Sequence, residues 1–246
     1  MELNLKGKRV LVTGASKGIG RACVEMLTAE GCTVLGASRS IAPGPAAKAS
    51  DLSQRGAAED LAAWAGELDI LVNNAGAIPG GDLQGVNEDV WRKAWDLKVF
   101  GYVNMCRRFY ALMKARGQGV IVNVVGNAAD THDPEYICGV AGNAALTAFS
   151  QSLGCVSAKD GIRVIALSPG PVETDRIVTL MKKKAKDRTG DENNWQELRK
   201  PLPFQRCATP DEIGAMAAFL ASPLSGYTSG SVVTIDAGLS ARATAF

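Results

Sequence analysis

The feature that most constrains this fold is the glycine-rich turn Thr13-Gly14-Ala15-Ser16-Lys17-Gly18-Ile19-Gly20. It follows residues 10–13, an apolar run with the length and β-branched content of a buried strand. Residues 21–30 after the turn have the composition of a helix, and Gly31 is a typical helix stop. A strand, a tight turn and a helix in this order form the first half of a βαβ unit with parallel strands.

The rest of the chain continues this alternation. Short apolar runs predict strands at residues 33–35, near 46–49, and at 70–73, 120–125, 163–167 and 232–235, while helices are expected at 60–65, 90–113, 144–157 and 211–221. Strands this apolar are typical of a parallel sheet that is covered on both faces. The sequence therefore predicts an α/β fold, a single doubly wound Rossmann-type domain over residues 1–246 with about seven parallel strands and helices on both faces.

Composition excludes several classes of protein. A chain of 246 residues with 46% hydrophobic residues can bury a large core. A net charge of +2 gives no support for a nucleic-acid partner, and one histidine with no C-x-x-C pair predicts no metal site. The longest apolar stretch, around 213–221, is too short to span a bilayer, and no apolar signal segment follows the start. We therefore expect a cytoplasmic protein without a membrane partner.

Each glycine of the turn has a physical reason. Gly14 permits the tight turn, Gly18 lets the backbone approach a phosphate, and Gly20 lets the helix pack closely on the strand. The start of the helix supplies free N–H groups and the positive end of the helix dipole. In this strand–helix context, the pattern favours binding of a dinucleotide pyrophosphate over an ordinary glycine-rich βα turn.

Five ordered motifs across almost the whole chain resemble those of the short-chain dehydrogenase/reductase family. They are the glycine turn, Asp51-Leu52, Asn73-Asn74-Ala75-Gly76, Pro169-Gly170-Pro171-Val172-Glu173-Thr174 and Asp236-Ala237-Gly238. Together with the glycines of the turn, the resemblance implies a nicotinamide cofactor. The expected contacts are Gly14, Ser16, Lys17, Gly18, Ile19, Gly20, Asp51, Leu52, Asn74, Ala75, Gly76, Pro169, Gly170 and Thr174.

The end of the second strand predicts which nicotinamide cofactor is used. Family members specific for NAD place an acidic residue there, bonded to the ribose hydroxyls. In this chain residues 36–39 read Gly-Ala-Ser-Arg and contain no acid. Arg39 and Lys17 can hold a 2′-phosphate, so we predict NADP(H). The alternative is that these two residues are solvated surface cations.

The four positions that carry the family's chemistry are altered. In the family a tyrosine is the acid/base, a lysine lowers its pKa, a serine holds the substrate oxygen and an asparagine anchors a relay water. Residues 144–146 fix the register of the Y-x-x-x-K pattern, which puts Gly139 at the tyrosine position and Asn143 at the lysine position. The same ungapped count places Gly126 at the serine position, and Lys98 falls at the asparagine position.

A nearby tyrosine suggests how the chemistry can survive. Tyr136 precedes Gly139 by three residues, a shift of about 4.5 Å in a helix, which a phenol can cover. We hypothesise that Tyr136 is a relocated acid, that Lys98 depresses its pKa, and that Asn143 contacts Lys98 with the family's pair exchanged. Asn127 is a candidate for holding the substrate oxygen. The alternative is that Tyr136 is a wall residue and Lys98 a structural cation.

Residues 175–207 are long, charged and irregular, so we expect a flexible substrate flap over the site. Its cations either meet an anionic substrate or belong to a solvated amphipathic helix. Residues 139–148 are rich in glycine and alanine, which permits close helix packing, and the resemblance implies homodimers or homotetramers.

The sequence thus predicts an NADP(H)-dependent oxidoreductase that interconverts a carbonyl and an alcohol on a small or acyl-type substrate, with an atypical proton-handling site. Two alternatives stay open. One is a non-catalytic NADP(H)-binding protein, acting as a sensor or as a partner of an active homologue. The other is a lyase-like or epimerase-like use of the same fold, because a fold alone does not prove chemistry.

Overall fold

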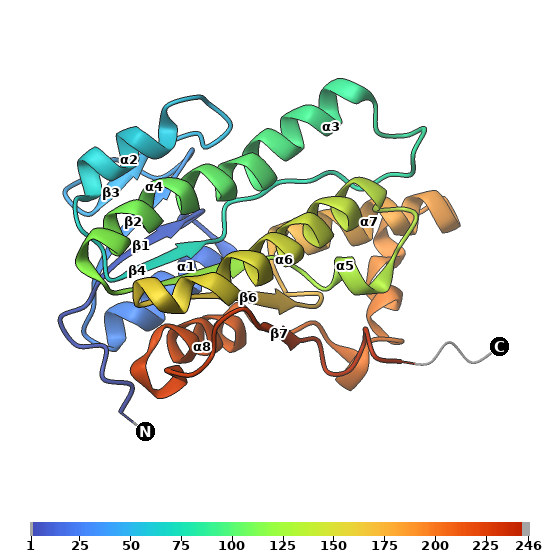
Figure 1. Cartoon of the computed structure of the whole chain (residues 1–246). Coiled ribbons are helices and arrows are strands. Elements are labelled where there is room, and N and C mark those ends of the chain that lie inside the picture. Colours follow the sequence, from blue (N-terminus) through green and yellow to red (C-terminus); the bar gives the residue numbers. More distant parts are fainter. Residues whose placement is uncertain (1, 243–246) are drawn as a thin grey trace.

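The structure is a computed structural model that describes residues 2–242 (Figure 1). Within them, seven parallel strands form one sheet in the order β3-β2-β1-β4-β5-β6-β7. The strands are β1 (Arg9–Thr13), β2 (Thr33–Ser38), β3 (Ala47–Ala49), β4 (Ile70–Asn73), β5 (Gly119–Val124), β6 (Ile162–Pro169) and β7 (Val232–Ile235). The strand order reverses between β1 and β4. This confirms the predicted doubly wound α/β architecture, in which ligands bind at that reversal.

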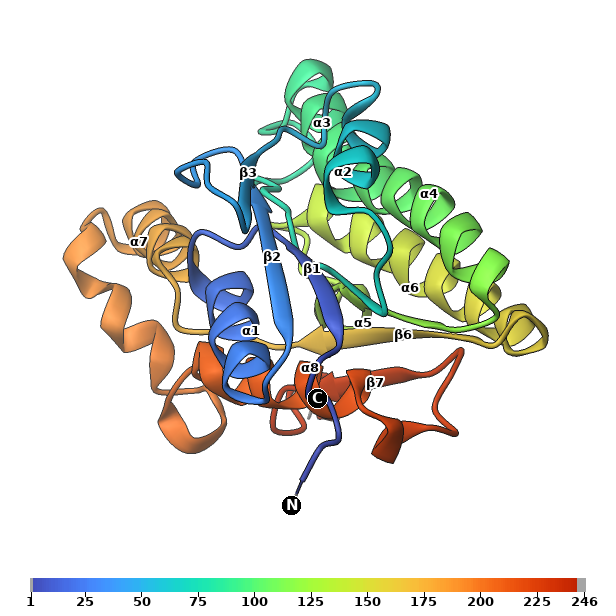
Figure 2. The same cartoon turned by 90° about the vertical axis from the view of Figure 1, so that its left-hand side faces the viewer.

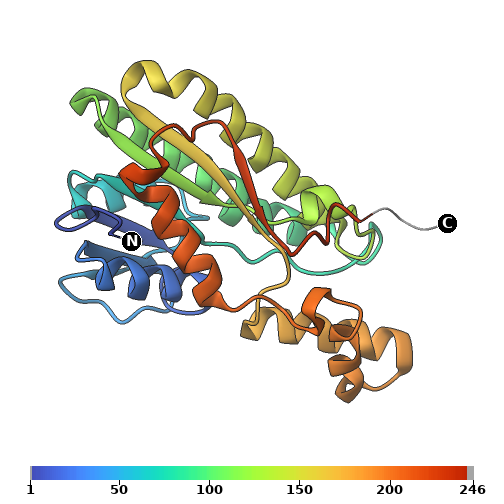
Figure 3. The same cartoon turned by 90° about the horizontal axis from the view of Figure 1, so that it is seen from below.

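Helices cover both faces of the sheet. Figures 2 and 3 show α1 (Gly18–Ala29) and α8 (Pro210–Ala221) on one face, and α2 (Ala57–Ala65), α4 (Gly101–Arg116) and α6 (Ile137–Ser157) on the other. Helices α3 (Glu88–Trp95), α5 (Ala128–Thr131) and α7 (Asp175–Thr189) lie toward the carboxyl ends of the strands.

Two predicted segments differ from the structure. The helix expected at 90–113 is continuous over α3 and α4, but Asp96–Phe100 between them is π-helical. Residues 175–189, expected to be irregular, form α7, which begins at the Thr174 side chain and ends at Gly190 in a left-handed conformation. The high charge of this segment hid its helical period, because only Met181 and Ala185 are buried.

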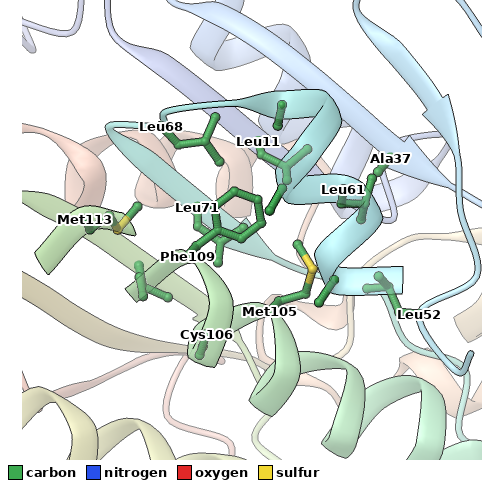
Figure 4. Close-up of a cluster of buried hydrophobic side chains, with 14 of the residues drawn as sticks. Leu11, Ala37, Leu52, Leu61, Leu68, Leu71, Met105, Cys106, Phe109 and Met113 are labelled. Carbon is green, nitrogen blue, oxygen red and sulfur yellow. The ribbon is translucent and has the colours of Figure 1, made fainter. Parts of the chain in front are cut away.

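The core on the α2–α4 face centres on an aromatic ring. Figure 4 shows Phe109 of α4 among Leu61 of α2, Leu71 of β4 and Leu11 of β1. All four side chains are fully buried. Burial of each such side chain stabilises the fold by about 1.5–3 kcal/mol, so this cluster fixes α4 against the sheet.

A buried polar network aligns the sheet with α6. The Asn73 amide of β4 donates to the Asn123 Oδ1 of β5 at 2.9 Å, and the Asn123 amide donates to the Ser150 Oγ of α6 at 2.9 Å. All three residues are buried. Because an unpaired buried amide is costly, this network favours one alignment of β4, β5 and α6. It thereby positions the helix that carries Gly139 and Asn143, two of the four altered catalytic positions.

Helix α6 also approaches the backbone of its neighbours through Gly154. A Cβ atom at this residue would overlap the Gly230 backbone and would lie 2.6 Å from the Val164 carbonyl oxygen. Both obstacles are backbone atoms, which cannot move aside as a flexible side chain would.

We therefore expect Gly154→Ala to lower the free energy of unfolding by about 2 kcal/mol or more, because α6 must shift off the sheet. Urea unfolding followed by circular dichroism measures the change. Gly44→Ala is the matched control, because a Cβ there meets nothing within 4 Å. Equal stability of the two variants would contradict the close contact.

Candidate active site

A cleft of about 1830 Å³ opens at the carboxyl ends of the strands. Its lining includes thirteen of the predicted cofactor residues: Gly14, Ser16, Lys17, Gly18, Ile19, Arg39, Leu52, Asn74, Ala75, Gly76, Pro169, Gly170 and Thr174. Gly20 and Asp51 are not in this lining. The cleft also includes Lys98, Tyr136 and Asn143, so all three candidate catalytic residues face the predicted cofactor region.

The glycine turn has the geometry that an anion site requires. Gly14 and Gly18 have φ values of +69° and +55°, in the left-handed region that favours glycine. A Cβ at Gly20 would overlap the Gly14 carbonyl oxygen, so this glycine acts through packing rather than through contact with a ligand. No side chain caps the start of α1, which leaves its first N–H groups free for a phosphate.

The ends of β4 and β6 meet this turn. The Asn74 side chain donates to the Thr13 carbonyl at 3.1 Å, and the Asn74 and Ala75 backbone amides both donate to the Thr13 hydroxyl. The Thr174 methyl group lies 3.0 Å from where a Cβ at Gly18 would sit. Three of the five sequence motifs are therefore assembled around one turn.

The end of β2 carries a polar corner of the same cleft. Arg39 and Lys17 are both exposed and line it. The Ser16 and Ser40 hydroxyls lie 3.2 Å apart and join the glycine turn to this loop. Ser38 lines the cleft, and its buried hydroxyl has no hydrogen-bond partner within residues 2–242. Two cations and an unpaired hydroxyl fit a phosphate group.

Asp51 is engaged elsewhere. Its Oδ1 accepts hydrogen bonds from the Ser53 backbone amide at 3.1 Å and from the Ser53 hydroxyl at 2.8 Å, which closes a local turn. The neighbouring Leu52 is buried and does line the cleft. In this pair it is therefore Leu52 that offers a surface to a cofactor.

Lys98 lies in the π-helical segment, whose wider turn is a frequent feature of functional sites. Its Nζ donates to the Val125 carbonyl at 2.7 Å, just beyond β5. A Cβ at Gly76 would lie 2.8 Å from the Lys98 Cδ, so the last glycine of the Asn73-Asn74-Ala75-Gly76 motif makes room for this side chain. Burial and repulsion from Arg176 lower the pKa of Lys98 to about 7.

Asn143 lies beside Gly126 rather than on Lys98. Its amide atoms are 3.4 Å from where a Cβ at Gly126 would sit, and Gly126 has a φ of +144° that favours glycine. Asn143 is buried, yet its Oδ1 has no hydrogen-bond partner within the described part of the chain. No hydrogen bond therefore joins the Asn143 Oδ1 to Lys98 there, and the Lys98 amine donates to the Val125 carbonyl.

The side-chain amide of Asn127, suggested for the substrate oxygen, already has a hydrogen-bond partner. Its amide donates to Asp236 Oδ2 at 3.1 Å. Burial disfavours the charged form of Asp236, but hydrogen bonds from Ser240, Asn127 and Gly238 outweigh burial and lower its pKa. Asn127 therefore ties the loop after β5 to the end of β7.

The Tyr136 ring lies directly against Gly139, the residue at the usual tyrosine position. Tyr136 lies just before α6, and a Cβ at Gly139 would fall inside its ring. Its hydroxyl accepts a hydrogen bond from Arg176 Nη2 at 2.9 Å, and the same nitrogen donates to the Ile78 carbonyl at 2.6 Å. Burial raises the pKa of Tyr136, and Arg176 offsets part of that effect.

The cation on Tyr136 is thus Arg176, not Lys98 as the sequence suggested. Lys98 has no resolved effect on the Tyr136 phenol, and its amine bonds to a different carbonyl. The sequence pattern does not point to Arg176, because residues 175–207 are expected to be irregular. One signal for it was available, since Arg176 follows Thr174 of the last cofactor motif by only two residues.

The flap helix α7 lies against the loop before α6. Lys184 pairs with Asp133 at 3.1 Å and with Glu135 at 2.7 Å, and Arg188 pairs with Glu135 at 3.2 Å. Lys183 donates to the Gly80 carbonyl at 3.1 Å. Three of the flap cations therefore hold the flap to the rim of the cleft.

The remaining chemical groups show little organisation. His132 is exposed, and its Nδ1 lies 2.9 Å from the Asp130 carbonyl oxygen. Within residues 2–242, no three histidine, cysteine or acidic side chains gather in a way that suits a metal ion. None of the helices in that range has the length and hydropathy of a transmembrane span.

Comparison with known proteins identifies the family. Residues 14–240 match the family model described as enoyl-(acyl carrier protein) reductase. The chain is 31% identical to the 3-oxoacyl-(acyl-carrier-protein) reductase of Vibrio harveyi, over 96% of this chain and 99% of that protein. This chain belongs to the short-chain dehydrogenase/reductase family. Members of this family are oxidoreductases that bind a nicotinamide cofactor.

Other relatives of this short-chain dehydrogenase/reductase act on sugars and sugar alcohols by name. Galactitol 2-dehydrogenase of Agrobacterium fabrum is 31% identical, over 96% of this chain and 99% of that protein. L-sorbose reductase of Gluconobacter frateurii, solved with NADPH and L-sorbose, is 27% identical with a TM-score of 0.88, covering 97% of this chain and 98% of that one.

The lowered pKa of Lys98 has a consequence for stability. Since the folded pKa of about 7 lies below the ordinary 10.5, the unfolded chain binds more protons between these values. The contribution of Lys98 to the free energy of unfolding therefore rises with pH across this window. The free energy of unfolding of Lys98→Met is compared with that of the native chain at each pH. We expect the value for the variant minus the value for the native chain to be higher at pH 6 than at pH 9, by about 1 kcal/mol or more.

Urea unfolding of both proteins at the two pH values measures this difference. Lys93→Met is the matched control, because Lys93 is exposed on α3. A difference for Lys98→Met that stays constant with pH, as expected for Lys93→Met, would show that the Lys98 amine is not desolvated.

Proposed function

We propose that this protein is an NADP(H)-dependent oxidoreductase that interconverts a carbonyl and an alcohol on a small or acyl-type substrate, with Tyr136 handling the proton. The observation that carries this proposal is the Tyr136 ring in the space beside Gly139, inside the cofactor cleft. The chain has lost the tyrosine of the usual sequence position, and the phenol of Tyr136 beside that position supports it as the substitute acid.

The cofactor part of the proposal is supported by the polar corner at the end of β2. Arg39 and Lys17 balance the charge of a 2′-phosphate, and the Ser38 hydroxyl supplies a further donor. A bound nicotinamide would give or take the hydride. The likeness to a sorbose reductase solved with NADPH agrees with this choice of cofactor.

The proton chemistry is assigned to side chains of this chain. In the reducing direction the substrate carbon gains the hydride, and the substrate oxygen gains the Tyr136 hydroxyl proton, which leaves a phenolate. Oxidation of the alcohol runs the same steps in reverse. Asn143, beside the Gly126 backbone, is placed to donate an amide N–H to the substrate oxygen, in the role that serine has in the family.

Lys98 supplies a second titrating group to the cleft. With a pKa of about 7, its amine can accept and release a proton at neutral pH. Its bond to the Val125 carbonyl holds it near the end of β5. We propose that Lys98 exchanges protons between the cleft and solvent, in place of the relay water that an asparagine holds in the family; because its amine makes no hydrogen bond to the Tyr136 hydroxyl, this relay needs a water molecule between them.

Binding without turnover remains a second candidate function. It is favoured by one observation, the glycines at 126 and 139, where the family's hydroxyl groups are missing. A protein of this kind would bind NADP(H) as a sensor or as the partner of an active homologue.

We also propose that the protein assembles as a homodimer or homotetramer through α6. Gly139 and Gly142 are covered within the chain, by Tyr136 and by Ile78 with Trp95. Ala144 and Ala148, one turn apart on α6, remain exposed. This exposed row of small side chains suits close approach of a second copy.

We expect Tyr136→Phe to reduce turnover at least ~100-fold while the affinity for NADPH changes less than threefold, because only the acidic proton is removed. The measurement is NADPH oxidation with a panel of acyl, keto-sugar and small ketone substrates, alongside nucleotide binding. Tyr227→Phe is the matched control, since Tyr227 is fully exposed. Unchanged turnover in Tyr136→Phe would reject this acid, and NADPH binding without turnover by the native protein would favour the sensor.

We expect Arg39→Ala to weaken NADPH binding by about 10–100-fold and NADH binding by less than threefold, because a charge-assisted hydrogen bond to the 2′-phosphate is lost. Fluorescence titration with each nucleotide measures both affinities. Arg55→Ala controls for loss of an exposed cation elsewhere. An equal loss for both nucleotides would contradict the assigned 2′-phosphate site.

A further inference from the structure

The proton-handling site receives its cation from a different element than in the usual sequence pattern. In the family's usual pattern, the lysine lies four residues after the tyrosine on the same helix. In this chain that position holds Asn143, and the cation that contacts the phenol is Arg176 in the first turn of α7. The site is therefore shared between α6 and the flap.

Arg176 is held in place by two acceptors. Its Nη2 donates to the Tyr136 hydroxyl at 2.9 Å and to the Ile78 carbonyl at 2.6 Å. No carboxylate within residues 2–242 forms a salt bridge with Arg176, so the guanidinium charge is not neutralised by an ion pair there. An unneutralised cation on a phenol oxygen favours the phenolate over the phenol.

We infer that Arg176 is the positioning residue of the proton-handling site, and that closure of α7 delivers it to the Tyr136 hydroxyl. This inference rests on the proposed role of Tyr136. Under this inference the flap has a part in the proton chemistry, because Arg176 contacts the Tyr136 hydroxyl only when α7 is docked.

The docking contacts all lie close to Tyr136. Lys184 and Arg188 bind Glu135, the residue directly before it, and Lys184 also binds Asp133. Gly81 pairs with the same segment, its amide donating to the Glu135 carbonyl at 2.7 Å. A flap that opens breaks these ion pairs and removes Arg176 from the phenol in one movement.

Few charged or titratable groups face the Tyr136 phenol. Arg176 comes from α7, Cys138 from α6, and Glu135 lies in the same loop but is turned toward Lys184 and Arg188. Lys98 of the π-helical segment interacts with Arg176 rather than with the phenol. Removal of Arg176 should therefore act on Tyr136 without a compensating cation.

The test is a titration of Tyr136 that needs neither substrate nor turnover. The full chain is labelled with 3-fluorotyrosine, a more acidic analogue, and the Tyr136 ¹⁹F resonance is assigned with Tyr136→Phe. We expect Arg176→Met to move the Tyr136 midpoint upward by about one pH unit or more, and Arg176→Lys to restore part of the shift. Lys186→Met, exposed on the same helix, is the control and should leave the midpoint unchanged.

A second variant separates flap docking from simple electrostatics. Glu135→Gln removes a negative charge beside Tyr136, which by itself would lower the midpoint. If it also frees α7, the loss of Arg176 from the phenol raises the midpoint instead. An upward shift supports the inference, while a downward shift overturns delivery by the flap.

An Arg176→Met midpoint equal to that of the native protein would overturn the inference outright. Circular dichroism of each variant verifies that it is folded. The outcome is separable from the proposed function. A Tyr136→Phe protein that keeps its turnover rejects Tyr136 as the acid, whereas lost turnover together with an unmoved Arg176→Met titration rejects only Arg176.

Discussion

The close approach of α1 to β1 at Gly20 is the constraint on which the rest of the structure depends. With no Cβ at this residue, the helix start comes against the Gly14 carbonyl and the Asn74 amide, and Asn74 in turn binds the end of β1. The contact brings the uncapped start of α1, the end of β4 and Thr174 to one place. An anion site follows directly, because free N–H groups gather there with no competing side-chain cap.

In the cleft, large polar side chains pack against glycines. The Tyr136 ring fills the volume left by Gly139, the Asn143 amide lies beside Gly126, and Lys98 runs past Gly76. At each place a large polar side chain lies against a glycine, and two of these glycines, Gly126 and Gly139, are altered catalytic positions. Function in such a site depends on volume and direction, so a motif that compares residues position by position reports a loss where the cleft has kept polar groups.

The electrostatics of the cleft are also redistributed. Burial is the main cause that lowers the pKa of Lys98, and repulsion from Arg176 lowers it further. Arg176 stays with the phenol, while Lys98 loses its charge near neutral pH. The division gives one group that stabilises a phenolate and another that exchanges protons, two tasks that require different pKa values.

The sequence by itself determined the α/β architecture, the glycine turn and most of the predicted cofactor residues that line the cleft, because these depend on local period and on glycines at fixed spacings. Strand β3 and the cleft position of Tyr136 were also predictable from short-range patterns. Only the tertiary structure placed Asn143 beside Gly126 and joined Asn127 to Asp236. It also showed that the cation on the Tyr136 hydroxyl is Arg176 and not Lys98. The physical reason is that these contacts join residues 17–109 positions apart, and their directions depend on how α6 and α7 pack, which no local pattern encodes.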